Sequence, residues 1–194
     1  MSYTAEISRN NPGCFLFVID QWGSMADTWA SGKSKANMVA DSVNRILQGL
    51  VIRCSKSEGI RDYFFAGIIG YGHGGGVISA FEGSLSGKEL VPISEIAQNP
   101  REILEKEISV DDGNGGTVNQ RVKFPIWLNP IADQQTPMRE AFGLANKIVT
   151  NWLNQNHNCF PPIVIHITDG ESTDGDPSQE MRALMNQTSA DGNV

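Results

Sequence analysis

Residues 14–25 read CFLFVIDQWGSM, and the interpretation of the whole chain starts from this stretch. Residues 14–19 are an unbroken apolar run that stops at Asp20, which is typical of a strand buried on both faces of a sheet. A loop with Gly23 and Ser24 follows. A carboxylate placed between a buried strand and a Gly/Ser loop usually holds a polar ligand, so the bulky Trp22 in that loop is unexpected.

Apolar runs and helical apolar spacing alternate along the rest of the chain. Further strands are predicted at 63–72, 76–81 and 163–168. Amphipathic helices are predicted at about 33–55 and 137–153, one or two short helices at 92–107 with Pro100 at a first helical position, and a helix start at 176–179. The alternation predicts an α/β fold, a doubly wound, mostly parallel open sheet with helices on both faces.

The length of 194 residues suits one domain spanning 1–194. Within it, a Gly/Asn/Asp turn between two extended runs indicates a hairpin excursion at 107–125. The DDGNGG run at 111–116 is interpreted as turn chemistry and not as a calcium loop, because Thr117 and Lys123 stand where an EF-hand needs glycine and glutamate.

The charge balance and the cysteines bound the possible partners and location. Fifteen basic and 22 acidic residues give a net charge of -7, which argues against nucleic acid or a polybasic membrane contact. Cys14, Cys54 and Cys159 lie in or beside apolar segments without a CxxC pair, so we expect reduced core thiols. No leader-like or membrane-spanning segment is recognisable, and we expect a cytoplasmic location.

Polar residues from distant segments are expected to meet at one edge of the sheet. Asp20 and Asp169 each follow a buried strand, and the carboxyl ends of parallel strands share a rim. Thr136 can reach this rim from the start of a helix, and Ser24 can turn back toward Asp20. Two carboxylates and two hydroxyls form an all-oxygen site, which favours magnesium, manganese or calcium over zinc or copper.

Three motifs, DQWGSM (20–25), QQTPMREA (134–141) and ITDGES (167–172), occur in the order and context found in the von Willebrand factor type A (VWA) domain. The chain resembles this family over residues 14 to about 190, most closely a bacterial cytoplasmic branch. The family's metal-ion-dependent adhesion site (MIDAS) has the pattern D-x-S-x-S, then a Thr, then an Asp. Asp20, Ser24, Thr136 and Asp169 match four of its five positions.

The resemblance implies a Rossmann-like fold and a role in binding proteins. It implies that a bound Mg²⁺ or Mn²⁺ would contact Ser24 and Thr136 directly or nearly so. Asp20 and Asp169 would hold the cation through water or one carboxylate oxygen, and a partner's Glu or Asp would complete its coordination.

The sequence departs from the family at two places. Trp22 stands where the family has its first serine ligand, and because an indole N–H can only donate, we expect cation binding to be weak or absent. The family also continues with one more strand and helix beyond the position of Val194, so the domain is expected to be C-terminally incomplete. Either the sequence is a fragment, or a partner or second copy supplies the strand by exchange or homo-oligomerisation.

Each site residue also has an ordinary structural interpretation. Thr136 before Pro137 suits a helix N-cap, Asp20 can cap its own loop, and Asp169 before Gly170 can be a turn aspartate. Trp22 is expected to pack against Trp29 or its loop, or to stand exposed as an anchor for a partner. His166, inside an apolar strand, is interpreted as a satisfied core histidine.

The preferred function is a non-enzymatic protein-interaction module that binds a partner at the carboxyl-end rim, ancestrally through a divalent cation. The first alternative is a metal-independent scaffold of the same fold. The second, with less support, is a phosphatase with Asp20 as nucleophile, which would require an aspartate at position 22 and a lysine near the second acid. An esterase is excluded because GSLSG, 83–87, puts Leu85 at the nucleophile position.

Overall fold

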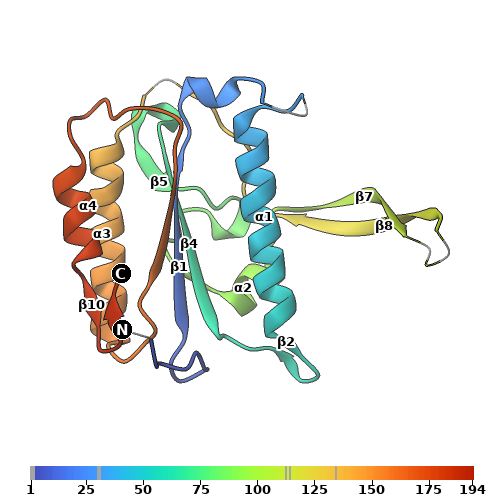
Figure 1. The fold of residues 1–194 in the computed structure, drawn as a ribbon, viewed down its shortest axis with the longest axis horizontal. Helices are drawn as coiled ribbons and strands as arrows, with labels where there is room; N and C mark the ends of the chain where they lie inside the picture. Colours follow the sequence, from blue (N-terminus) through green and yellow to red (C-terminus); the bar gives the residue numbers. More distant parts are fainter. Residues whose placement is uncertain (1–2, 30–31, 112, 114, 134) are drawn as a thin grey trace.

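The structure is a computed structural model that describes residues 3–29, 32–111, 113, 115–133 and 135–194. Gln134 of the QQTPMREA motif, and Asp112 and Asn114 of the expected hairpin turn, lie outside the described residues. The protein is a mixed α/β structure built on a mostly parallel sheet, shown in Figure 1.

The central sheet has the strand order β5-β4-β1-β9, with β6 also paired to β4. Strand β1 (Gly13–Asp20) lies between β4 (Phe64–Tyr71) and β9 (Ile163–Ile167) and is parallel to both. Strands β5 (Val77–Ser79) and β6 (Val91–Pro92) pair antiparallel with β4. These pairings confirm the strands predicted from the apolar runs. Among the described residues β9 pairs only with β1, so its other edge has no strand beside it.

Helices cover both faces of the sheet (Figure 1). The first face is covered by α1 (Lys35–Cys54) and α2 (Ile93–Gln98). The second is covered by α3 (Met138–Gln155), against which α4 (Ser178–Met185) packs. Along β1, Phe17 and Ile19 belong to the core on the α1 side, whereas Leu16 and Val18 belong to the core on the α3 side. The uninterrupted apolar run therefore reflects burial on both faces.

The hairpin formed by β7 (Glu102–Asp111) and β8 (Thr117–Ile126) projects from the body as an arm (Figure 1). The hairpin is longer than the predicted 107–125. The prediction of one or two short helices at 92–107 is corrected, because only α2 is helical there and β7 begins at Glu102. Pro100 starts no helix because Arg101 N–H donates to Ile126 C=O at 2.8 Å and the β7–β8 ladder begins at once. Long-range pairing satisfies the backbone groups that a second helix would have bonded locally.

The remaining elements are short. They are the 3-10 helices η1 (Gly23–Ala26), η2 (His73–Gly75) and η3 (Gly83–Leu85) and the paired strands β2 (Ser55–Lys56), β3 (Gly59–Ile60), β10 (Thr188–Ser189) and β11 (Gly192–Asn193). Asp191, in the turn between β10 and β11, accepts hydrogen bonds from Thr4 N–H and Thr4 Oγ1, both at 2.7 Å. All three cysteines are free and buried, as predicted.

Candidate functional site

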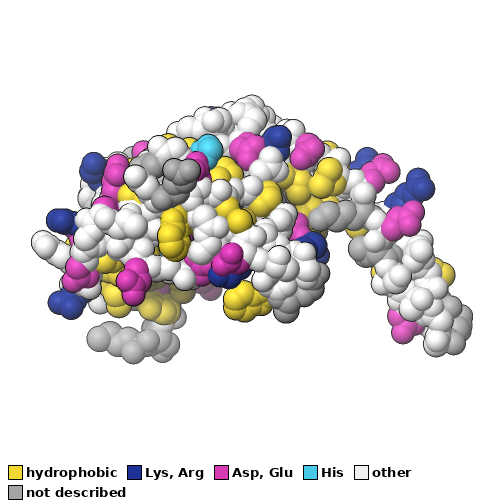
Figure 2. Space-filling view, turned by 90° about the horizontal axis from the view of Figure 1, so that it is seen from above, with side chains coloured by type: hydrophobic (Ala, Val, Ile, Leu, Met, Phe, Trp, Pro, Cys, Tyr) yellow, Lys and Arg dark blue, Asp and Glu magenta, His cyan; other side chains and the backbone are white. Residues whose placement is uncertain are grey.

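The predicted site residues lie at the rim where the parallel strands end. Ile19 of β1 is opposite Ile167 of β9, so Asp20 and the Thr168–Asp169 pair follow at the same edge of the sheet. This edge is at the top of Figure 1. Figure 2 looks down on it and shows acidic side chains beside apolar ones. The topology therefore brings Asp20 and Asp169 together across the sequence, as expected for parallel neighbours.

Asp20 is buried, with 1% of its surface exposed, and both of its oxygens accept hydrogen bonds. Trp22 N–H donates to Oδ1 at 2.9 Å, and the Thr168 hydroxyl donates to Oδ2 at 2.6 Å. Burial raises the pKa of Asp20, hydrogen bonds from Thr168, Trp22 and Tyr71 only partly offset that effect, and the charge of Asp169 raises the pKa further. The interpretation of Asp20 as a cap of its own loop thus accounts for one of its two oxygens.

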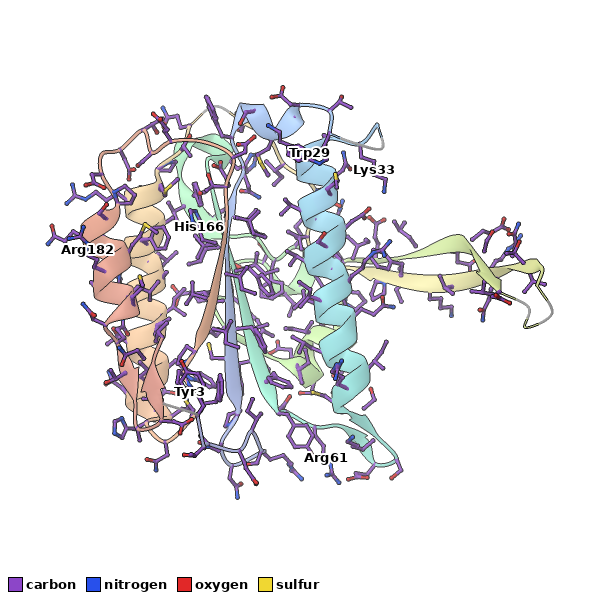
Figure 3. All side chains as sticks on the ribbon, in the orientation of Figure 1. Tyr3, Trp29, Lys33, Arg61, His166 and Arg182 are labelled. Atoms are coloured by element: carbon purple, nitrogen blue, oxygen red, sulfur yellow. The ribbon has the colours of Figure 1, made fainter. Side chains whose placement is uncertain are left out.

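Tyr71 and His166 form a polar pair close to Asp20. Tyr71 ends β4 opposite Asp20 and is fully buried, and its hydroxyl lies 2.7 Å from His166 Nε2. His166, labelled in Figure 3, packs against Phe142 of α3 with ring centroids 4.9 Å apart. Burial lowers the pKa of His166, which favours the neutral ring. These contacts confirm that His166 is a satisfied histidine, although it is half-buried and not fully in the core.

Asp169 is held by two donors from the segment that follows β1. The Ser24 hydroxyl donates to Oδ1 at 2.6 Å, and the Lys35 ammonium donates to Oδ2 at 2.6 Å. Burial opposes ionisation of Asp169, but the hydrogen bonds from Lys35 and Ser24 outweigh it and lower the pKa of Asp169. The side chain therefore links two loops and does more than cap its own turn.

Lys35 is the site residue that the sequence reasoning missed. It is the first residue of α1, directly after the N-cap Ser34, whose hydroxyl accepts the N–H of Asn37. Its hydrogen bond to Asp169 raises the pKa of Lys35, which stays protonated. The sequence does carry one local signal for Lys35. The N-terminal end of the helix dipole disfavours positive charge, so a lysine at a helix start indicates an acidic partner nearby. The identity of its partner was not readable from the sequence.

Thr136 is fully buried, and its Oγ1 has no hydrogen-bond partner among the described residues. Its backbone is tied to the loop after β9, because Thr136 N–H donates to Thr173 Oγ1 at 3.0 Å and Thr173 N–H donates to Thr136 C=O at 2.9 Å. The N-cap alternative for Thr136 is wrong. Asp174 caps α3 instead, accepting the N–H groups of Arg139 at 3.0 Å and Glu140 at 2.8 Å.

Trp22 belongs to the loop after β1, and its ring packs against the loop after β9. A Cβ at Gly170 would be 3.3 Å from Trp22 Cε3 and 3.9 Å from Asp20 Oδ2, so the indole covers the Gly170 backbone beside the buried carboxylate. Trp22 also forms a parallel bridge with Asp133. Among the described residues no aromatic contact joins Trp22 to Trp29, and the packing partner of Trp22 is thus the Gly170 loop.

An apolar groove of about 260 Å³ adjoins the Lys35–Asp169 pair. The lining residues come from η1 and its loop, α1 and the end of β9: Met25, Trp29, Lys35, Met38, Val39, Ile167, Thr168 and Asp169. Trp29 is 56% exposed, and the Lys35 ammonium lies 6.0 Å from its ring centroid. Figure 3 shows Trp29 at the rim end of α1. The groove and the polar site therefore share residues.

The side chains as arranged do not fit a divalent cation. All four carboxylate oxygens of Asp20 and Asp169 already accept hydrogen bonds, and one of these comes from a fully charged ammonium. The side chain at position 22 offers no oxygen, which leaves the buried Thr136 hydroxyl as the one expected ligand without a partner among the described residues. In the described part of the chain, no cluster of three or more His, Cys, Asp or Glu side chains is placed to hold a metal.

A scan of the sequence against protein-family models found no match, and a search of curated proteins found none either. In the part of the chain that the structure describes, no helix combines the length and apolarity needed to cross a bilayer. The resemblance to the VWA family stays a prediction that rests on the three ordered motifs.

Proposed function

We propose that this chain is a non-enzymatic protein-interaction module with a Rossmann-like VWA fold, and that it binds a partner protein at the carboxyl-end rim. The observation that carries the proposal is the 2.6 Å hydrogen bond from Ser24 to Asp169. It joins the first and last expected motifs across 145 positions of the sequence. An adhesion-type rim needs both loops at the same point, and this hydrogen bond supports that arrangement.

The second candidate is recognition at the same rim without a metal. Lys35 favours it, because its ammonium neutralises Asp169 and leaves no free anionic pair for a cation. In that case the contact surface is the exposed Trp29 and the groove beside it, since a large aromatic side chain next to an apolar hollow suits a protein partner. Both candidates use one surface, and they differ in whether that surface was ancestrally a site for Mg²⁺ or Mn²⁺ that Trp22 has impaired.

The phosphatase alternative has less support. A nucleophilic aspartate needs a free oxygen directed at its substrate, but Asp20 is buried and both of its oxygens accept hydrogen bonds. We therefore propose that the chain is not an enzyme. Turnover of p-nitrophenyl phosphate by the wild type that is lost in Asp20→Asn would contradict this.

We also propose a cytoplasmic location, supported by three buried cysteines that remain unpaired. The oxidation state of these thiols in protein isolated from cells without reducing agent tests this. A disulfide-linked population would argue for an oxidising compartment.

The rim proposal is tested by capture of partners from cell extract, with quantitative mass spectrometry, on immobilised wild type, Trp29→Ala and Ile52→Ala. Ile52 is also an exposed apolar residue, 65% exposed, but it lies near the far end of α1. We expect a specific partner to be weakened at least about tenfold by Trp29→Ala and unaffected by Ile52→Ala, because exposed aromatic anchors dominate interface energies. Equal capture by all three proteins would refute recognition at the rim.

A further inference from the structure

The Lys35 ammonium contacts the Asp169 carboxylate, which would otherwise be a ligand for a cation. Lys35 Nζ is 2.6 Å from Asp169 Oδ2, and it lies 3.6 Å from Asp27 Oδ2. The side chains of Lys35 and Asp169 are only 22% and 18% exposed, so this pair is partly withdrawn from water, whereas Asp27 is open to solvent at 68%. Asp169 is therefore the principal partner of Lys35.

The position of Lys35 is costly for the helix that carries it. Lys35 opens α1, where backbone N–H groups make the helix end electropositive, and the first turn contains no acidic residue to compensate. Its backbone is fixed by the 3.0 Å hydrogen bond from Lys35 N–H to Asp27 C=O. The local helix does not favour a cation here, but the contact with Asp169 from the end of β9 does.

Lys33 provides a comparison two residues away. Its ammonium pairs with Asp41 at 2.8 Å, and its side chain is 56% exposed. The two lysines thus carry the same charge at the same end of α1 (Lys33 is labelled in Figure 3), but only Lys35 contacts a rim carboxylate. Any effect of general surface charge on cation binding must therefore appear when either lysine is replaced.

We infer that Lys35 is an internal counter-cation that excludes divalent ions from this rim, as a second block in addition to Trp22. The inference rests on the proposed adhesion-type function. An ammonium and a divalent ion on the same Asp169 carboxylate repel each other at close range, so binding of the ion is disfavoured for as long as Lys35 stays in contact with Asp169. Replacing Trp22 by serine restores an oxygen but leaves this second block in place.

The test is an Mn²⁺ titration, followed by isothermal calorimetry and water-proton relaxation, of Trp22→Ser alone and combined with Lys35→Met or Lys33→Met. We expect Trp22→Ser/Lys35→Met to bind Mn²⁺ about tenfold more tightly than Trp22→Ser, the size of effect typical of groups that contact metal ligands. Trp22→Ser/Lys33→Met should bind like Trp22→Ser. Thermal melting by circular dichroism establishes that each variant is folded, and Lys35→Gln serves as a second, polar replacement.

The outcomes separate the two proposals. If Trp22→Ser binds Mn²⁺ and removal of Lys35 gives no gain, the counter-cation inference is overturned while the adhesion-type rim stands. If neither Trp22→Ser nor the Lys35 double variants bind, the inference falls together with the cation origin of the rim, and the metal-independent candidate remains. An equal gain from Lys33→Met would show that only net charge matters and would also overturn the inference.

Discussion

Thr168 donates a 2.6 Å hydrogen bond to Asp20 across 148 positions of the sequence, and this bond joins the ends of two neighbouring parallel strands. Its acceptor is a carboxylate that is only 1% exposed, and Trp22 N–H donates to the other oxygen of the same group. The bond therefore favours the ionised form of Asp20, against the effect of burial, and ties the end of β1 to the loop after β9.

Replacing Thr168 by valine is expected to lower the free energy of unfolding by about 1–3 kcal/mol at pH 7, because the buried carboxylate loses a donor. A raised pKa in the folded state contributes stability that is present at low pH and lost as the pH rises, and Thr168→Val raises the pKa of Asp20 further. The deficit should thus be smaller at pH 4 than at pH 7 in urea unfolding. Thr168→Ser keeps the hydroxyl and is the control; equal losses for both variants would refute the explanation.

The cap of α3 by Asp174 gives a second prediction. Burial opposes ionisation of Asp174, but hydrogen bonds from the Ser172 hydroxyl and from Arg139 and Glu140 N–H lower its pKa. Asp174→Ala should destabilise the protein by about 1 kcal/mol, the usual value of a lost N-cap. This contribution is present above the usual Asp pKa of about 3.9 and is lost as the pH falls through the folded-state value.

The cap prediction is checked by urea unfolding of wild type, Asp174→Ala and Asp174→Asn between pH 3 and 7. The asparagine has one oxygen acceptor for the two N–H groups, so an intermediate loss is expected. If the wild type and Asp174→Ala differ by the same amount at every pH, the carboxylate plays no part in the cap.

Two glycines are expected to respond in opposite directions to alanine. A Cβ at Gly67 of β4 would overlap the backbone oxygen of Glu89 and lie 2.9 Å from Leu16 Cδ1, and neither group can move freely. Gly67→Ala should destabilise by about 1–3 kcal/mol through this overpacking. A Cβ at Gly49, inside α1, would meet nothing within 4 Å, and Gly49→Ala should stabilise by up to about 1 kcal/mol. Thermal unfolding of both variants measures the contrast, and two shifts of the same sign would contradict it.

The hydrogen-bonded pair of buried Tyr71 and half-buried His166 predicts a pH response near neutrality. Because burial lowers the pKa of His166, the neutral ring contributes stability that is present above the ordinary value of about 6.5 and is lost as the pH falls through the folded-state pKa. His166→Gln should therefore lose less stability than the wild type between pH 7 and pH 5. A proton NMR titration that placed the His166 pKa at or above 6.5 would rule this out.

Local patterns were sufficient for most secondary structure. The apolar run at 14–19 required a strand covered on both faces, and the helical spacing in 137–153 required a helix with one buried side. Asp176 lies in the helix start predicted at 176–179, and its Oδ1 accepts Ser178 N–H at 2.9 Å at the start of α4, a contact between near neighbours in the sequence. Asp174, two residues earlier, caps α3 through Arg139 across 35 positions, and no local pattern could assign it.

The sequence by itself determined that the chain alternates buried strands with amphipathic helices and that Asp20 and Asp169 follow two of those strands, because burial and periodicity act over a few neighbouring residues. Tertiary structure alone decided which donors these carboxylates meet. Lys35, Thr168 and the unpaired Thr136 hydroxyl acquire their roles only when β1, α1 and β9 converge at one rim. The reason is that an ion pair or a buried hydrogen bond depends on distances across the sheet, and those distances are fixed by packing and not by separation along the chain.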